Sequence, residues 1–319
     1  FASNYYQYPL GRVLYAAMPG NLRKGKSLTK FIDSVGITDD GKNINLASLK
    51  KRAPKQAALM SILMKKNTLD SHVLSNIFPE WKKYSKRPIE NNWIKISQIV
   101  ESYSDPRKLK KSTKGPKLNS EQKKAILDIK NSPTFNTFLL DGVTGSGKTE
   151  VYLSLISDVI ERGQDALILV PEIGLINQLN RRIEARFGIK PSQYHSGLTE
   201  TERFITWKKI QESKTRIILG TRSAILAPFK NLGLIVVDEE HDISYKQQEG
   251  FRYSARDLAI MMAKDFNVPI ILGSATPSIE SFKQHVNNKY KYLTLKKRAG
   301  NAKLPSMHLI DLNNSNSED

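Results

Sequence analysis

The chain has 319 residues, a length that suits about two domains, and 39% of them are hydrophobic, which is enough for buried cores. It contains no cysteine, which excludes disulfides and thiolate zinc sites, and its five histidines are too scattered for metal-ligand spacing. No apolar run approaches the roughly 20 residues of a membrane span, and no charged-then-apolar leader follows Phe1, so we expect a cytoplasmic protein without a membrane partner.

The formal net charge of +19 is unevenly distributed. Residues 1–117 hold 23 Lys and Arg against 8 Asp and Glu, so the first third of the chain carries most of the positive excess. A basic surface of this kind suits a polyanion such as nucleic acid. A solvated basic surface without a ligand is the alternative.

The first third of the chain predicts a small DNA-binding domain. Residues 53–66 carry apolar side chains at helical spacing, and residues 68–77 predict a second short helix. A small core and a β wing can come from the residues that follow, namely Trp81, Tyr84, Trp93, Ile94 and Ile96. We interpret residues 26–103 as a winged-helix-like DNA-binding domain and residues 1–25 as an N-terminal connecting segment. Any small helical domain with a basic surface is the alternative.

Residues 104–117, SDPRKLKKSTKGPK, predict an exposed basic linker because they combine two prolines, a glycine and many lysines. From Leu118 onward, short apolar runs alternate with longer helical stretches such as 150–162 and 176–187. The predicted strands are 137–140, 166–170, 216–219, 234–237 and 268–272. This alternation predicts an α/β lobe over residues 118–319, with a parallel sheet covered on both faces. The polar tail at 313–319 is predicted to be disordered.

Residues 142–149 read GVTGSGKT and match G-x-x-x-x-G-K-[ST] between a predicted strand and a predicted helix. Glycines let backbone N–H groups turn toward phosphate oxygens, and the helix start adds its positive end. Lys148 can reach the β and γ phosphates, and Thr149 can offer its hydroxyl to Mg²⁺. The pattern predicts that ATP and Mg²⁺ bind at Gly142, Val143, Thr144, Gly145, Ser146, Gly147, Lys148 and Thr149.

An acidic motif, DEEH, follows the apolar run 234–237. A parallel strand ends at the carboxyl edge of its sheet, where ligands bind, so Asp238 can hold Mg²⁺. Glu239 is the predicted general base, since a second carboxylate that the cation does not sequester can orient the attacking water. An acidic loop without a catalytic role is the alternative.

The sequence contains three further motifs: VPEIGL at 170–175, GTRSA at 220–224 and GSATPS at 273–278. Together with the P-loop and the DEEH box, this order resembles the first, RecA-like motor lobe of superfamily 2 helicases. The phrases YYQYPLG, LNSEQKKA, SYKQQEGFRYSARDLA and KKRAGNAKLP resemble, more narrowly, the primosomal replication-restart helicases.

The resemblance implies roles for single residues at the nucleotide site. Gln122 corresponds to a glutamine that reads adenine, with an ordinary surface glutamine as the alternative. Ser274 and Thr276 correspond to the SAT element that links hydrolysis to strand movement. His241, at the end of the DEEH box, is expected to couple the nucleotide state to DNA. The catalytic residues implied are Lys148, Asp238, Glu239 and His241.

The resemblance also implies a DNA surface. The GTR turn is expected to grip the backbone of a single strand through Gly220, Thr221 and Arg222. A later stretch interleaves aromatic rings with cations, which suits stacking on unpaired bases at about 1–3 kcal/mol per base. Its residues are Tyr245, Lys246, Phe251, Arg252, Tyr253 and Arg256. The family has a tryptophan at the position of Phe251. An ion pair for Arg222 and a closed hydrophobic patch for the aromatic rings are the alternatives.

The whole family implies an ATP-dependent 3′-to-5′ DNA helicase in a bacterial, nucleoid-associated location, which restarts stalled replication forks and assembles primosomes. Its expected partners are single-stranded and forked DNA, primosome proteins and the single-strand binding protein. The resemblance places a 3′-end-binding domain, the second motor lobe with its arginine finger, and a cysteine-rich zinc part outside this chain. The fragment should therefore bind ATP and DNA but hydrolyse slowly.

Two other functions stay open from the sequence. One is the lobe of a RecG-like or restriction-type DNA translocase, against which YKQQEGFRYSARD argues. The other is a nucleotide-gated DNA-binding adaptor without catalysis. A transporter ATPase is disfavoured because the sequence holds no LSGGQ-like stretch.

Overall fold

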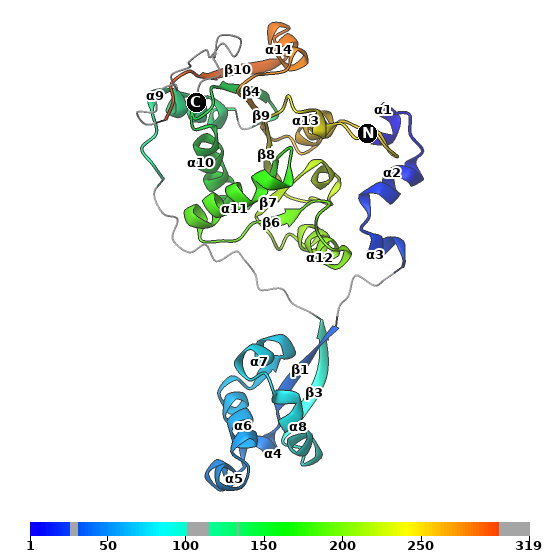
Figure 1. Cartoon of the computed structure of the whole chain (residues 1–319), viewed down its shortest axis with the longest axis vertical. Helices are drawn as coiled ribbons and strands as arrows, with labels where there is room; N and C mark the ends of the chain where they lie inside the picture. The colour runs from blue at the N-terminus through cyan, green and yellow to red at the C-terminus, as the bar shows by residue number, and fades with distance from the viewer. Residues whose placement is uncertain (26–30, 101–114, 133, 300–319) are drawn as a thin grey trace, which may run out of the picture. The chain divides into compact units, whose positions relative to one another are not determined.

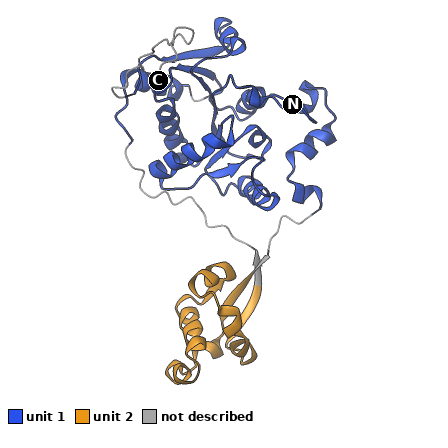
Figure 2. Ribbon diagram, viewed as in Figure 1, with its two compact units in different colours: residues 1–25, 105–319 blue, residues 26–104 orange. Residues whose placement is uncertain are grey.

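The computed structural model describes residues 1–25, 31–100, 115–132 and 134–299, and it separates into two compact units (Figures 1 and 2). Unit 1 combines residues 1–25 with residues 105–319, and unit 2 comprises residues 26–104. Most of the predicted linker, residues 104–114, and the predicted tail at 313–319 lie outside the described residues.

Unit 2 is a three-stranded antiparallel sheet with helices packed on it. The strands pair in the order β2-β1-β3 and are β1 (Phe31–Ile37), β2 (Thr68–Asp70) and β3 (Ile94–Val100). The helices are α4 (Asp39–Lys42), α5 (Leu46–Arg52), α6 (Pro54–Lys66), α7 (Ser71–Ile77) and α8 (Trp81–Glu90). Along the chain the elements follow in the order β1-α4-α5-α6-β2-α7-α8-β3, and β1 lies between the other two strands of the sheet. The expected winged-helix DNA-binding role of this unit stays a prediction.

Local sequence explains where these helices begin. Pro54 opens α6, since proline suits the first helical position. Asp70 caps α7 by accepting a hydrogen bond from the Val73 N–H at 2.7 Å. The indole of Trp81 donates to the Ser75 hydroxyl at 2.9 Å and is 1% exposed. The core also contains the fully buried side chains Leu59, Met60, Leu63 and Leu74.

Unit 1 contains a seven-stranded sheet in which all neighbouring strands are parallel, with the order β10-β4-β9-β8-β5-β7-β6. The strands are β4 (Thr137–Gly142), β5 (Asp165–Leu169), β6 (Ser192–Tyr194), β7 (Ile217–Gly220), β8 (Leu232–Asp238), β9 (Ile270–Ser274) and β10 (Tyr290–Leu295). The five predicted strands correspond to β4, β5, β7, β8 and β9, and the predicted parallel α/β fold is confirmed. The sequence analysis missed β6 and β10.

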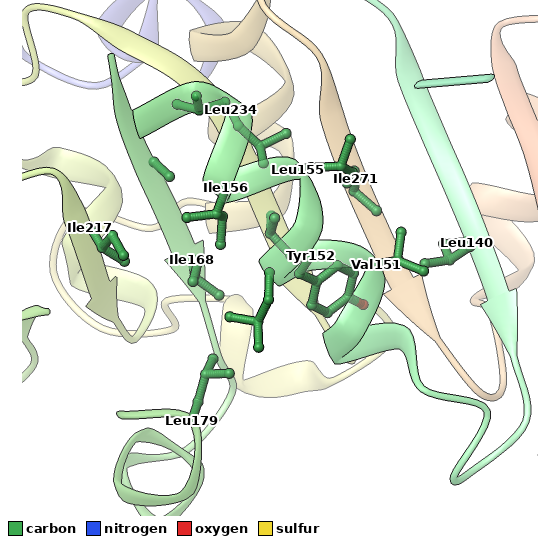
Figure 3. Packing of buried hydrophobic residues seen from close by; sticks show 14 of the residues in the cluster. Leu140, Val151, Tyr152, Leu155, Ile156, Ile168, Leu179, Ile217, Leu234 and Ile271 are labelled. Atoms are coloured by element: carbon green, nitrogen blue, oxygen red, sulfur yellow. The ribbon is translucent and has the colours of Figure 1, made fainter. Parts of the chain in front are cut away.

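Helices cover both faces of this sheet (Figure 1). One layer packs α9 (Ser120–Lys130), α10 (Lys148–Glu161) and α11 (Ile173–Phe187) on residues such as Leu140 and Ile168 (Figure 3). The other layer contains α12 (Glu200–Gln211), α13 (Ala255–Asp265) and a short 3-10 helix, η1 (Arg222–Leu226), and packs on alternate residues such as Leu139 and Leu169. Helices η2 (Ile243–Tyr245) and α14 (Ile279–Val286) complete the unit.

The first 25 residues pack on this α/β unit. They form three short helices, α1 (Ala2–Tyr5), α2 (Leu10–Ala17) and α3 (Gly20–Arg23). Val13 of α2 is buried in the second hydrophobic layer, and a Cβ on Gly20 would lie 2.0 Å from the Glu200 carboxylate of α12. Residues 1–25, which the sequence predicted to be a connecting segment, therefore pack as part of unit 1.

Candidate functional site

The P-loop lies between the end of β4 at Gly142 and the start of α10 at Lys148. Gly145 and Gly147 have φ angles of +79° and +82°, a region that glycine enters without steric cost. The start of α10 leaves backbone N–H groups without helical partners, which makes it an anion site. Ser146 Oγ is buried without a hydrogen-bond partner among the described residues, so a polar group is available inside the loop.

The P-loop follows β4 and the DEEH box follows β8, and only β9 lies between these two strands in the sheet. Lys148 Nζ donates to the Gly142 carbonyl at 2.9 Å and lies 3.7 Å from Glu239 Oε1. Its side chain is only 10% exposed. The structure therefore brings together Lys148 and Glu239, two of the residues that the sequence assigns to catalysis, and the half-buried Thr149 follows Lys148 in the same helical turn.

Two tyrosines hold Asp238 at the end of β8. The Tyr152 hydroxyl donates to Asp238 Oδ1 at 3.0 Å, and the Tyr245 hydroxyl donates to the Asp238 carbonyl at 2.6 Å. Burial raises the pKa of Asp238, and the negative charge of Glu239 raises it further. Burial also raises the pKa of Tyr152 well above its usual value, with a further contribution from Asp238. The sequence analysis assigned Tyr152 no role, although its place one turn after the P-loop is visible there.

His241 links the DEEH box to the SAT turn. Its Nδ1 lies 2.7 Å from Ser274 Oγ, which also accepts a hydrogen bond from the Thr276 N–H at 2.9 Å. The same ring nitrogen lies 3.8 Å from Glu239 Oε2. The His241 ring therefore lies between the proposed base and the end of β9. Its expected role in coupling the nucleotide state to DNA stays a prediction.

Gln122 supports the P-loop from the side of α9. It is 3% exposed, and its Nε2 donates to the Ser146 carbonyl at 2.8 Å. Its Oε1 accepts from the Asn119 N–H at 2.9 Å, which completes a capping box at the start of α9. A Cβ on Gly147 would lie 2.3 Å from Gln122 Nε2, so only glycine fits there. The expected adenine contact of Gln122 stays a prediction.

The GTR turn is tied to the polypeptide that follows the DEEH box. Arg222 Nη1 donates to the carbonyls of Ser244 and Lys246 at 3.0 and 2.9 Å. Gly220 is in close contact with β6, because a Cβ there would lie 2.4 Å from the Tyr194 carbonyl, and the Thr221 N–H donates to the same carbonyl at 3.3 Å. The expected grip of this turn on DNA stays a prediction.

The aromatic rings of residues 245–253 are buried, whereas the sequence analysis expected them to stack on bases. Phe251 stacks on Tyr253 with a centroid distance of 5.0 Å and lies 5.2 Å from Tyr8 and 6.0 Å from Tyr6. Exposure is 2%, 6% and 7% for Tyr245, Phe251 and Tyr253. Tyr6 and Tyr8, in the segment between α1 and α2, thus cover Phe251, and the expected stacking of these rings on unpaired bases stays a prediction.

The cations of the same stretch divide into two groups. Lys246 and Arg252 are exposed. Arg256 instead donates from Nη1 to Glu240 Oε2 and to Ser278 Oγ, both at 3.0 Å, so it is not available as the expected DNA contact in this structure. Beside the GTR turn lies a cavity of about 670 Å³ whose lining includes Arg23, Arg203, Arg222, Ser223, Ser244 and Phe251.

The donor set at the P-loop fits magnesium better than a metal held by protein alone. Thr149 and Asp238 offer oxygen atoms, which Mg²⁺ prefers, and Mg²⁺ usually completes its shell with phosphate and water. Within the described ranges, no group of three or more His, Cys, Asp or Glu side chains could hold a metal ion. Within the same ranges, no helix has the length and apolar character needed to cross a membrane. The expected cytoplasmic location stays a prediction.

Known proteins with similar sequences belong to the helicases. A family model described as DEAD/DEAH box helicase matches residues 119–285. Replication restart protein PriA of Haemophilus influenzae is 40% identical over 99% of this chain and 44% of that protein. Its counterpart from Bacillus subtilis is 44% identical over 71% of this chain and 29% of that protein. The resemblance to replication-restart helicases is thereby confirmed, and the chain spans less than half the length of these relatives.

Among solved structures, RecG bound to a three-way DNA junction is similar with 26% identity and a TM-score of 0.46. The match covers 60% of this chain and 25% of that one.

Proposed function

We propose, on the premise that this chain belongs to the DEAD/DEAH box helicase family, that unit 1 is the ATP-binding motor lobe of a replication-restart DNA helicase. The proximity of Lys148 Nζ to Glu239 Oε1, at 3.7 Å, supports this most directly. It brings a phosphate-binding cation and a base within one site at the carboxyl edge of a parallel sheet.

Each residue of this site has a proposed task. Lys148 and the P-loop N–H groups bind the phosphates, and Glu239 accepts a proton from the attacking water. Thr149 and Asp238 would hold Mg²⁺, which neutralises phosphate charge when bound. Tyr152 keeps Asp238 in place through its hydroxyl, and His241 connects Glu239 with Ser274.

We further propose that single-stranded DNA binds in the cavity beside the GTR turn. The cationic lining residues Arg23, Arg203 and Arg222 suit a phosphate backbone, although Glu172 and Glu249 also line it. In unit 2, α8 carries Lys82, Lys83, Lys86 and Arg87 and is proposed to bind the duplex part of a fork. Primosome proteins and the single-strand binding protein are proposed partners of the longer protein, as is unwinding in the 3′-to-5′ direction.

The isolated chain should bind ATP·Mg²⁺ and DNA but turn over slowly. An arginine finger contributes about 10³–10⁵ in rate, and the family supplies it from the second lobe, which we expect outside this chain. Equilibrium binding of ATP and forked DNA, with single-turnover hydrolysis, tests the proposal. Lys148→Ala should abolish nucleotide binding but spare DNA binding at low salt. Wild-type protein that fails to bind ATP would contradict the motor assignment.

Glu239→Gln separates a motor from a nucleotide-gated adaptor. A motor variant should still bind ATP and should lose hydrolysis, because the water then lacks its base. An adaptor would keep every measurable property, including the effect of nucleotide on DNA affinity. DNA affinity should also fall steeply with salt, and a flat salt dependence would argue against an electrostatic role of the basic surfaces.

A further inference from the structure

Glu240 differs from its neighbours in the DEEH box because its carboxylate is buried and fully engaged. Its side chain is 0% exposed. Oε1 accepts a hydrogen bond from the Ser278 N–H at 2.7 Å, and Oε2 accepts from the hydroxyls of Ser278 and Ser281 at 3.1 and 2.7 Å. Arg256 Nη1 donates to the same Oε2 at 3.0 Å. The carboxylate therefore joins the end of β8 to the first turns of both α13 and α14.

The ion pair between Glu240 and Arg256 constrains geometry more than it adds stability. Its two side chains are 0% and 14% exposed, so both charges are largely removed from water. The cost of that desolvation offsets most of the attraction between them, which makes a buried pair a weak source of net stability. The pair, together with the hydroxyls of Ser278 and Ser281, fixes the position of residue 240.

Residue 240 in turn determines where Glu239 lies. Glu239 has a φ angle of +47°, in the left-handed region that non-glycine residues rarely adopt and that surrounding contacts must hold. On its C-terminal side, the Glu240 N–H donates to the Gly273 carbonyl at 2.9 Å, and the buried Glu240 side chain prevents rotation of the chain. Held this way, the Glu239 carboxylate lies 3.7 Å from Lys148 Nζ.

Arg256 lies close to the buried aromatic rings of residues 245–253, which we call the aromatic stretch. That stretch closes with a β-bridge between Lys246 and Ser254, and Ser254 caps α13 by accepting from the Asp257 N–H at 3.2 Å. The Tyr6 hydroxyl accepts from the Ser254 N–H at 3.0 Å. Arg256 lies in the first turn of α13, directly after this cap.

We propose that Glu240 and Arg256 are a positioning pair that sets the orientation of the base Glu239. The inference rests on the proposed function, because it assumes that Glu239 acts on nucleotide. It gives Arg256 a role inside the motor in place of the DNA contact expected from sequence.

A second buried ion pair in the same unit provides a matched control. Arg216 Nη1 lies 2.8 Å from Asp165 Oδ1, with side chains that are 12% and 3% exposed. This pair lies at the amino ends of β5 and β7, the opposite edge of the sheet from the DEEH box. Arg216→Gln and Arg256→Gln therefore break pairs of similar burial, but only Arg256 is connected to Glu239.

The first measurement separates nucleotide affinity from hydrolysis in the full chain. Arg256→Gln should leave the Kd for ATP·Mg²⁺ within about twofold and slow single-turnover hydrolysis by about 10- to 100-fold, the loss typical of a misplaced catalytic group. Arg256→Lys should recover part of the rate because it restores the charge. Arg216→Gln should hydrolyse at the wild-type rate. Equal losses in Arg216→Gln and Arg256→Gln would reduce the pair to a structural contact and overturn the proposal.

The second measurement needs no hydrolysis. The chain has five histidines, so the ring signals of His241 can be assigned in an NMR spectrum by their loss in His241→Gln. They should shift in Arg256→Gln and stay unchanged in Arg216→Gln, since His241 follows Glu240 directly. Unmoved signals, or wild-type hydrolysis in Arg256→Gln, would overturn the proposal. If wild-type protein fails to bind ATP, the proposed function fails, and the His241 signals still decide whether the pair positions its neighbours.

Discussion

Replacing Gly273 by alanine tests the packing around Asp238. A Cβ at position 273 would lie 1.7 Å from the Tyr152 hydroxyl oxygen and 3.0 Å from Tyr152 Cζ. Tyr152 belongs to α10, is 1% exposed and points into the hydrophobic core (Figure 3), so its ring cannot move into solvent. Overpacking of a core costs about 1–3 kcal/mol, and losing the hydrogen bond to Asp238 adds about 1 kcal/mol. We therefore expect Gly273→Ala to destabilise unit 1 by roughly 2–4 kcal/mol.

A double-mutant cycle identifies the cause of that loss. Tyr152→Phe removes the hydroxyl oxygen, so the closest remaining contact of the new Cβ is Cζ at 3.0 Å. The double variant should lose about 1–2 kcal/mol less unfolding free energy than the sum of the losses in the two single variants. Calorimetry or urea unfolding can measure this difference. Gly174→Ala is the control, because its Cβ meets nothing within 4 Å and alanine favours a helix. Additivity within about 0.5 kcal/mol would refute the steric argument.

Three further predictions concern other parts of unit 1. Gln122→Ala removes two hydrogen bonds at the P-loop and the start of α9 and should weaken ATP binding by about tenfold; a loss confined to ATP would support adenine reading, and an equal loss for GTP would contradict it. Burial raises the pKa of Asp165 to about 6, against the opposing effect of Arg216. Stability should therefore fall by at most about 3 kcal/mol as pH rises from about 4 to about 6, and urea midpoints of Asp165→Asn should lack this slope. Tyr8→Ala removes an aromatic contact worth about 0.5–1.5 kcal/mol and should speed amide hydrogen exchange across residues 247–254; unchanged exchange would contradict the role of Tyr8 in covering Phe251.

The core of the nucleotide site was predictable because it depends on short-range patterns and one rule of sheets. The P-loop spacing determines the glycine turns, and parallel strands all end at one edge. In the observed order only β9 separates β4 from β8, so the P-loop and the DEEH box lie close together. Edge strands were harder to detect: β6 has three residues, and in β10 Lys291 and Thr294 interrupt the apolar run that marks the central strands.

The environment of the aromatic stretch could not be predicted from the stretch itself. Rings interleaved with cations suit unpaired bases and other aromatic rings equally well. In the folded unit, Phe251 contacts other aromatic rings, namely those of Tyr6 and Tyr8, which lie more than 240 residues away in the sequence. The signal that was available is the phrase YYQYPLG, whose aromatic rings need a hydrophobic partner. The contact of Arg256 with Glu240 could not be predicted for the same reason, because only the fold brings the two residues together, and the expected DNA contact of Arg256 stays a prediction.

The DEEH box shows how one backbone angle gives consecutive residues different tasks. A continued strand would place Asp238 and Glu240 on one face and Glu239 on the other. The left-handed φ of Glu239 ends that alternation: Asp238 contacts Tyr152, while Glu240 contacts Arg256 and the start of α14. Asp238 and Glu240 thus have separate side-chain partners, which leaves the Glu239 carboxylate beside Lys148. A residue that relaxes this angle, such as glycine in Glu239→Gly, would thus be a poor test of base function, and Glu239→Gln, which keeps the side-chain shape, is the informative substitution.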